Sequence, residues 1–107
     1  MKTIEWAAGL FEGEGSIVKR SDRDLYRLQL VMTDLDVIED FRKVVGLEDR
    51  TIETINRKDK PDYYKTQYAL RINKKADVYR VLEAMLPYLG LRRAHKALDC
   101  LDTLDNI

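Results

Sequence analysis

One segment, residues 6–17, constrains this chain more than any other, because it carries three glycines and two glutamates across a predicted helix-to-strand boundary. Residues 4–11 are mostly good or neutral helix formers, whereas Gly-Glu-Gly at 13–15 ends that pattern and an extended one follows. Glu12 and Glu14 are therefore predicted at the carboxyl end of a helix, where the macrodipole makes each acid cost about 0.3–1 kcal/mol. A divalent cation bound by carboxylate and carbonyl oxygens would offset that cost. The alternative is two solvated acids beside a glycine that ends the helix.

Gly9 lies in the middle of this predicted helix, where glycine costs about 0.5–1 kcal/mol relative to alanine. Such a cost is tolerated where another backbone must come close. Helical spacing places Gly9 on one stripe with Trp6, Leu10 and Gly13, and small residues four apart favour close packing of two helices. If the second helix came from another copy of the chain, two-fold symmetry would bring two Glu14 side chains together. The stripe is therefore the predicted dimer interface.

Residues 7–15, Ala-Ala-Gly-Leu-Phe-Glu-Gly-Glu-Gly, resemble the nine-residue LAGLIDADG signature of homing endonucleases. They match its second, third, fourth and ninth positions and carry acids at its sixth and eighth. The resemblance extends over nearly the whole chain and implies a site-specific double-strand DNA endonuclease that hydrolyses phosphodiester bonds with Mg²⁺, for which Ca²⁺ or Mn²⁺ can substitute in the site. Because the chain has one signature, the resemblance implies a homodimer that recognises a pseudo-palindromic site.

Length and composition describe one ordinary globular domain over residues 1–107. Of these residues 36% are charged and 45% hydrophobic, and 19 basic residues balance 19 acidic ones, so net charge does not indicate a DNA-binding protein. The lone Cys100 excludes an intrachain disulfide and favours a reducing compartment. No apolar run is long enough to span a membrane. We therefore expect a soluble intracellular protein, in the cytoplasm of a prokaryotic or phage-infected cell or in an organelle, with no membrane partner.

Periodicity after the first helix predicts an α+β fold. Alternating apolar and polar residues predict two hairpins, and apolar residues at helical spacing predict three further helices. The predicted order is strands 16–20 and 25–32, helix 34–45, strands 50–56 and 63–72, helix 74–85 and helix 91–104. One four-stranded antiparallel sheet with helices on one face satisfies these apolar stripes, including Leu91, Ala94, Leu98 and Leu101 in the last helix. LAGLIDADG domains have this α-β-β-α-β-β-α-α order, and there the open face of the sheet is a DNA-binding saddle.

The open face of that sheet is predicted to bind double-stranded DNA. Arginine and glutamine read guanine and adenine in the major groove, although a solvated sheet face uses many of the same residue types. In the third strand, Ile52 inward would place Glu53 and Ile55 outward, and an acid there would repel phosphate. The predicted DNA-facing residues are Ser16, Val18, Arg20, Arg27, Gln29, Val31, Arg57, Lys65, Gln67 and Arg71.

The resemblance also implies roles in the chemistry. Glu14 and the carbonyl oxygen of Gly13 bind Mg²⁺, and Glu12 has a secondary role, either at the helix end or around the ligands of the metal. Similar endonucleases carry a lysine or arginine shortly after a Leu-Pro-Tyr-Leu segment, which makes Arg92 the candidate for stabilising charge at the transition state. The alternative for Arg92 is an ion pair with surface acids or a contact with a phosphate that takes no part in the chemistry.

Met32 departs from the pattern of the nucleases, because similar proteins often place a polar, water-holding residue just before the second helix. This leaves room for a non-cleaving relative that binds DNA or RNA, such as a maturase-like splicing factor or a transcription regulator. A third alternative is a dimerisation module without nucleic acid. No sequence feature indicates a small-molecule substrate, and the single histidine, His95, is not part of a metal-ligand cluster.

Overall fold

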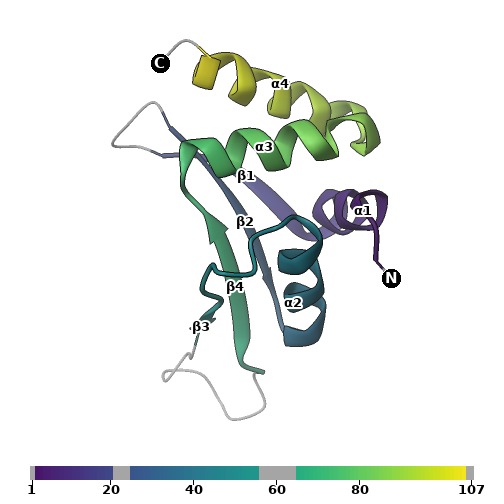
Figure 1. Ribbon diagram of the computed structural model, residues 1–107, viewed down its shortest axis with the longest axis vertical. Helices are drawn as coiled ribbons and strands as arrows, with labels where there is room; N and C mark the ends of the chain where they lie inside the picture. The colour runs from purple at the N-terminus through teal and green to yellow at the C-terminus, as the bar shows by residue number, and fades with distance from the viewer. Residues whose placement is uncertain (1, 21–24, 56–64, 106–107) are drawn as a thin grey trace.

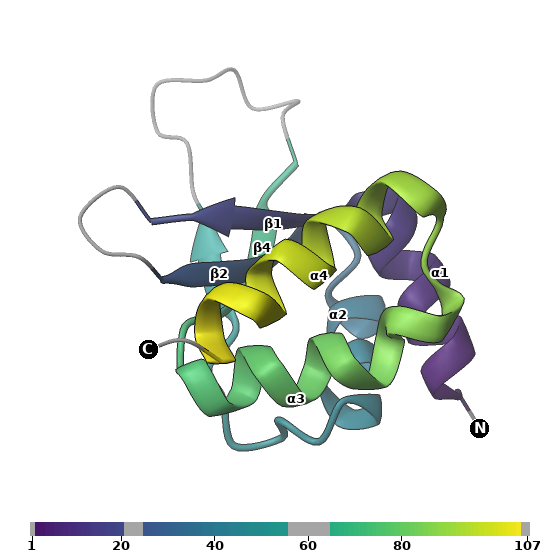
Figure 2. The ribbon, with the colours of Figure 1, turned by 90° about the horizontal axis from the view of Figure 1, so that it is seen from above.

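A computed structural model describes residues 2–20, 25–55 and 65–105. Its elements are helices α1 (Ile4–Glu14), α2 (Leu35–Val44), α3 (Lys75–Met85) and α4 (Leu91–Asp105), the 3₁₀ turn η1 (Leu86–Tyr88), and strands β1 (Gly15–Lys19), β2 (Tyr26–Met32), β3 (Glu53–Ile55) and β4 (Gln67–Ile72). The strands form one antiparallel sheet in the order β1-β2-β4-β3. Figure 1 and Figure 2 show the described helices gathered on one side of the strands. The predicted α+β fold is confirmed.

The helix–strand boundaries follow local backbone chemistry. α1 continues through Gly13 to Glu14, and the N–H of Gly15 donates to the carbonyl of Phe11. Gly46, just beyond α2, adopts a φ of 75°, a conformation that glycine reaches without steric cost and that stops the helix as predicted. β3 is shorter than the predicted strand at 50–56, and β4 begins later than the predicted residue 63. Residues 56–64, where both predicted strands meet their loop, lie outside the described residues.

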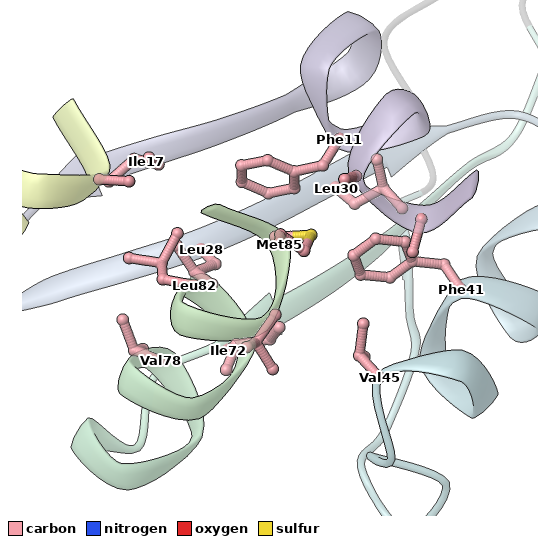
Figure 3. Close-up of a cluster of buried hydrophobic side chains, with 14 of the residues drawn as sticks. Phe11, Ile17, Leu28, Leu30, Phe41, Val45, Ile72, Val78, Leu82 and Met85 are labelled. Atoms are coloured by element: carbon pink, nitrogen blue, oxygen red, sulfur yellow. The ribbon is translucent and has the colours of Figure 1, made fainter. Parts of the chain in front are cut away.

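Apolar side chains from α1, α2 and α3 pack against one face of the sheet (Figure 3). Leu28 of β2 lies opposite Ile72 of β4, and the alternate residues Leu30 and Leu70 lie on the same, core-facing side of the sheet. Phe11 and Phe41 stack with ring centroids 6.4 Å apart, which joins α1 to α2 over the sheet. The core therefore fixes the end of α1, where the predicted site begins.

The apolar stripe predicted for α4 is wrong at Leu91 and Leu98. Leu91 and Leu98 are 78% and 50% exposed, whereas the buried face carries Ala97, Cys100, Leu101 and Leu104. Both sets have helical spacing, and the packing of α4 against α3 selects the second. Burial raises the pKa of the Cys100 thiol to about 12, so this residue behaves as a small core side chain.

Gly15, where α1 ends and β1 begins, is expected to matter for stability. A Cβ on residue 15 would lie 2.3 Å from the nearest atom of the Phe11 ring, which is buried in the core. We expect Gly15→Ala to lower the free energy of unfolding by about 1–3 kcal/mol in urea denaturation, because the ring must move within a packed core. Gly13→Ala, compared at a concentration where the chain is monomeric, is the control, since no described atom of the subunit lies within 4 Å of its Cβ position. Equal losses in the two variants would contradict this account.

Candidate functional site

Glu14 is the last residue of α1, and its side chain is exposed. Its carboxylate forms no hydrogen bond or ion pair with any part of the chain that the structure describes. At this end of a helix the macrodipole is also negative, so the charge of Glu14 is uncompensated. Its carboxylate and the neighbouring carbonyl of Gly13 are the oxygen ligands that hard divalent cations prefer. Over residues 2–20, 25–55 and 65–105, no three His, Cys, Asp or Glu side chains lie together as a metal-binding group.

Glu12, two residues earlier, in contrast accepts hydrogen bonds at both carboxylate oxygens and at its backbone oxygen. Its Oε1 accepts the N–H of Gly90, and its Oε2 and its backbone oxygen each lie 3.0 Å from Nε of Arg93. These contacts join the end of α1 to the beginning of α4 across 78 and 81 residues of sequence. The negative charge of Glu12 is thus compensated by the guanidinium of Arg93 and by the N-terminus of α4. This agrees with a secondary role at the helix end.

Arg92 lies in the first turn of α4, directly before Arg93. Figure 1 and Figure 2 both place the turn from α3 to α4 beside α1, and the contacts of Glu12 hold it there. The guanidinium of Arg92 is exposed and has no partner among the described residues. The structure therefore brings the two residues predicted for the chemistry, Glu14 and Arg92, to the same corner of the molecule. Sequence reasoning missed Arg93 and Gly90 as partners of Glu12, because no sequence pattern links residues so far apart.

The predicted outward face of the sheet is confirmed by the strand register. Ser16 pairs with Gln29, Gln29 with Arg71, and Ala69 with Glu53, and paired residues share the face opposite the core. No described helix covers this face. The same register places Val18, Arg27, Val31 and Gln67 there. Arg20 and Lys65 lie just outside the strands, and Arg57 lies outside the described residues.

Acceptor side chains hold two arginines of this open face. Nε of Arg71 lies 3.2 Å from Oε1 of Gln29, and its Nη1 forms an ion pair with Glu53. Nε of Arg27 lies 2.7 Å from Oδ1 of Asn73. Glu53 faces outward, as the register with Ile52 inward requires, so the acid on this face is paired with a base. Sequence reasoning placed the arginines on the face but did not identify these partners, which come from neighbouring strands or follow them.

The exposed face of α1 carries the stripe predicted for dimerisation. Ala7, Ala8 and Phe11 are buried, whereas Gly9 and Gly13 are exposed, and Trp6 and Leu10 are half-buried. No described atom lies within 4 Å of a Cβ built on Gly9 or Gly13. The fold of the subunit therefore gives no steric reason for glycine at either position.

Met32 lies opposite Tyr68 across β2 and β4, on the side of the sheet that faces the helices. Its side chain is partly buried against the core. The position therefore presents no polar atom to the open face, and exposed Thr33 follows it beyond the strand.

The model of a family described as the LAGLIDADG-like domain matches residues 4–85, from α1 through α3. The chain belongs to the LAGLIDADG family. No curated protein matches it.

Solved LAGLIDADG homing endonucleases share the fold. The crystal structure of I-TnaI superimposes with a TM-score of 0.73 at 20% identity, over 98% of this chain and 72% of that one. I-CvuI bound to its Sro1.3 target with 2 mM Ca gives a TM-score of 0.66 at 21% identity. I-CvuI bound to the I-CreI target with 2 mM Mg, in which the DNA is not cleaved, gives 0.65 at 21% identity. In both cases the match covers 95% of this chain but 65% of the I-CvuI chain, so this LAGLIDADG chain spans about two thirds of that endonuclease.

Proposed function

We propose that two copies of this chain form a site-specific, Mg²⁺-dependent endonuclease that cuts both strands of a pseudo-palindromic DNA duplex. The observation that carries the proposal is the exposed, uncompensated carboxylate of Glu14 at the end of the family's signature helix. The structural likeness to homing endonucleases bound to target DNA supports a duplex as the substrate. We further propose that this duplex lies in the cytoplasm of a prokaryotic or phage-infected cell, or in an organelle. None of the described helices is long and apolar enough to cross a membrane.

The open face of the sheet is the surface that we propose for DNA. It is free of described helices and carries arginine and glutamine side chains, whose donors and acceptors suit base edges in the major groove. Arg71 is held by Gln29 and Glu53, so its position is set before DNA arrives. The full proposed set is Ser16, Val18, Arg20, Arg27, Gln29, Val31, Arg57, Lys65, Gln67 and Arg71.

A second copy would complete the site. One chain contributes Glu14 as its free carboxylate at this corner, because Glu12 is already bound to Gly90 and Arg93. The stripe of Trp6, Gly9, Leu10 and Gly13 gives α1 a partly exposed face, open at the two glycines, on which the same helix of another copy could pack. Leu91, 78% exposed and adjacent to Gly90, extends apolar surface beside this helix end.

The chemistry that we propose divides among three groups. Glu14 and the carbonyl oxygen of Gly13 hold Mg²⁺, whose positive charge lets the acidic corner accept a phosphate. The cation supplies activation of water and stabilisation of negative charge during phosphodiester hydrolysis. Arg92 donates hydrogen bonds to the phosphate oxygens, on which charge increases towards the transition state.

A non-cleaving DNA- or RNA-binding relative is the second candidate function. Met32 favours it, because this position faces the helices and offers no polar group to hold a water molecule at the open face. Such a protein would bind its site through the same sheet and leave the Mg²⁺-binding corner without a cutting role. Cleavage itself separates the two functions.

Glu14→Gln tests the catalytic assignment. Wild-type protein is first incubated with Mg²⁺ and a library of duplexes, and the cut ends are sequenced to find the target. On that target we expect the variant to lose at least about 100-fold in single-turnover cleavage rate while binding the duplex in Ca²⁺ normally. Glu5→Gln removes the same charge from the first turn of α1 and is the control. Cleavage by Glu14→Gln at the wild-type rate would refute the assignment, and wild-type binding without cutting would favour the second candidate.

Gly9→Leu tests the dimer. The subunit has space for the side chain, and replacing a helical glycine favours the helix, so the variant should fold. We expect monomers in sedimentation equilibrium at concentrations where the wild type is dimeric, because leucine prevents close approach of two α1 helices. Ala84→Leu, also a small-to-large change at an exposed helical position, should leave the mass unchanged. An unchanged mass for Gly9→Leu would remove α1 from the interface.

Glu53→Gln tests the electrostatics of the open face. Removing this acid leaves Arg71 free to contact phosphate, so duplex affinity should rise about 3–10-fold at low salt and its salt dependence should steepen by about one counterion. Fluorescence anisotropy over a range of NaCl concentrations measures both quantities. Asp49→Asn removes an acid that also pairs with an arginine, Arg50, but lies outside the sheet, and it should change neither. Weaker binding by Glu53→Gln would mean that the acid positions Arg71 more than it repels DNA.

A further inference from the structure

Glu12, Gly90 and Arg93 form a three-residue cluster that holds α4 against α1. Both carboxylate oxygens of Glu12 and its backbone oxygen are used in it. The side chain of Arg93 is 20% exposed, and its Cζ lies 5.7 Å from the centroid of the Phe11 ring. The Glu12–Gly90–Arg93 cluster is therefore anchored on the aromatic core and not on mobile surface groups.

Gly90 is part of the cluster for a steric reason. A Cβ on this residue would lie 2.8 Å from Oε1 of Glu12 and 3.3 Å from its carboxyl carbon. A side chain at residue 90 would require the Glu12 carboxylate to move, whereas glycine leaves room for it to accept the backbone N–H. The N–H of Ala94 then donates to the carbonyl of Gly90, which begins the helix.

The cluster is adjacent in sequence to both groups of the proposed chemistry. Glu12 precedes Glu14 by two residues, and Arg93 directly follows Arg92. We infer that Glu12 and Arg93 are positioning residues, which fix Arg92 relative to Glu14 so that one cation and one phosphate can be held between them. This inference rests on the proposed nuclease function. Of the two acids at the end of α1, Glu12 and Glu14, the cluster also leaves only Glu14 without a partner among the described residues, because Arg93 neutralises Glu12.

A role in stability alone makes a different prediction from a role in positioning. If the cluster only stabilised the fold, substitution of Glu12 would lower stability, and loss of the Arg92 side chain would reduce cleavage equally with or without that substitution. If the cluster positions Arg92, a variant with a broken cluster has already lost most of the contribution of Arg92 to the cleavage rate, so removing Arg92 as well costs little more. The two effects are then strongly non-additive.

A double-mutant cycle measures this difference. Single-turnover cleavage is compared for the wild type, Glu12→Gln, Arg92→Ala and the double variant, all well below their unfolding temperatures. We expect Arg92→Ala to cost about 100-fold in the wild type but less than about 3-fold in Glu12→Gln, with duplex affinity within about 3-fold throughout. Asp77→Asn is the control, since it breaks the Arg50–Asp77 ion pair of 2.8 Å away from this corner and should leave the cost of Arg92→Ala unchanged. Arg93→Lys, which keeps the charge but loses the planar donor, replaces Glu12→Gln if that variant does not fold.

A distance measurement tests the inference without cleavage. Spin labels on cysteines at positions 14 and 92, in a Cys100→Ala background diluted with unlabelled chain, should give a narrow distance distribution that Glu12→Gln broadens and Asp77→Asn does not. If the wild type cut no duplex, the proposed nuclease function would be refuted. A narrow distance distribution that Glu12→Gln broadens would still support the positioning of residue 92 by the cluster. Additive costs in the cycle, or a distribution that Glu12→Gln leaves unchanged, would overturn the inference.

Discussion

Burial of one face of α1, and only one, is the constraint on which the rest of the structure depends. Ala7, Ala8 and Phe11 enter the core, Trp6 and Leu10 pack partly against it, and Gly9 and Gly13 remain exposed. The Phe11 ring occupies the space beside residue 15, so glycine at that point lets the chain leave the helix without displacing the ring. That exit begins β1 and leaves Glu14 at the surface, next to the open face of the sheet.

Glu12 and Glu14 lie near the same helix end but differ in their partners. The dipole disfavours both, but Glu12 is compensated by Arg93 and by the N–H of Gly90, whereas Glu14 has no partner in the described chain. An acid left uncompensated in this way costs stability and gains affinity for a cation. Such local conflicts with stability are typical of functional positions, which is why the contrast between the two residues supports a role for Glu14.

The open face explains how a chain of zero net charge can still be proposed to bind DNA. Two of its arginines have partners in the described chain, because Arg71 forms an ion pair with Glu53 and Arg27 donates to the neutral amide of Asn73. Glu53 reduces the long-range attraction of Arg71 for phosphate, and both hydrogen-bonding partners hold the guanidinium groups in place. The arrangement favours selection of a fitting site over indiscriminate binding, in keeping with the balanced composition.

The sequence by itself determined the signature helix, the two hairpins, the outward parity of β1, β2 and β4 and the prominence of Glu14, because all of these follow from local spacing and turn chemistry. It also indicated Arg92, though only through the resemblance to the family. It could not choose between the two apolar stripes of α4, since both have helical period and only packing against α3 decides that Leu91 and Leu98 stay outside. Nor could it foresee the role of Gly90 or the pairs of Glu12 with Arg93 and Glu53 with Arg71. These contacts join residues far apart in the chain, so they exist only once tertiary packing has brought separate elements together.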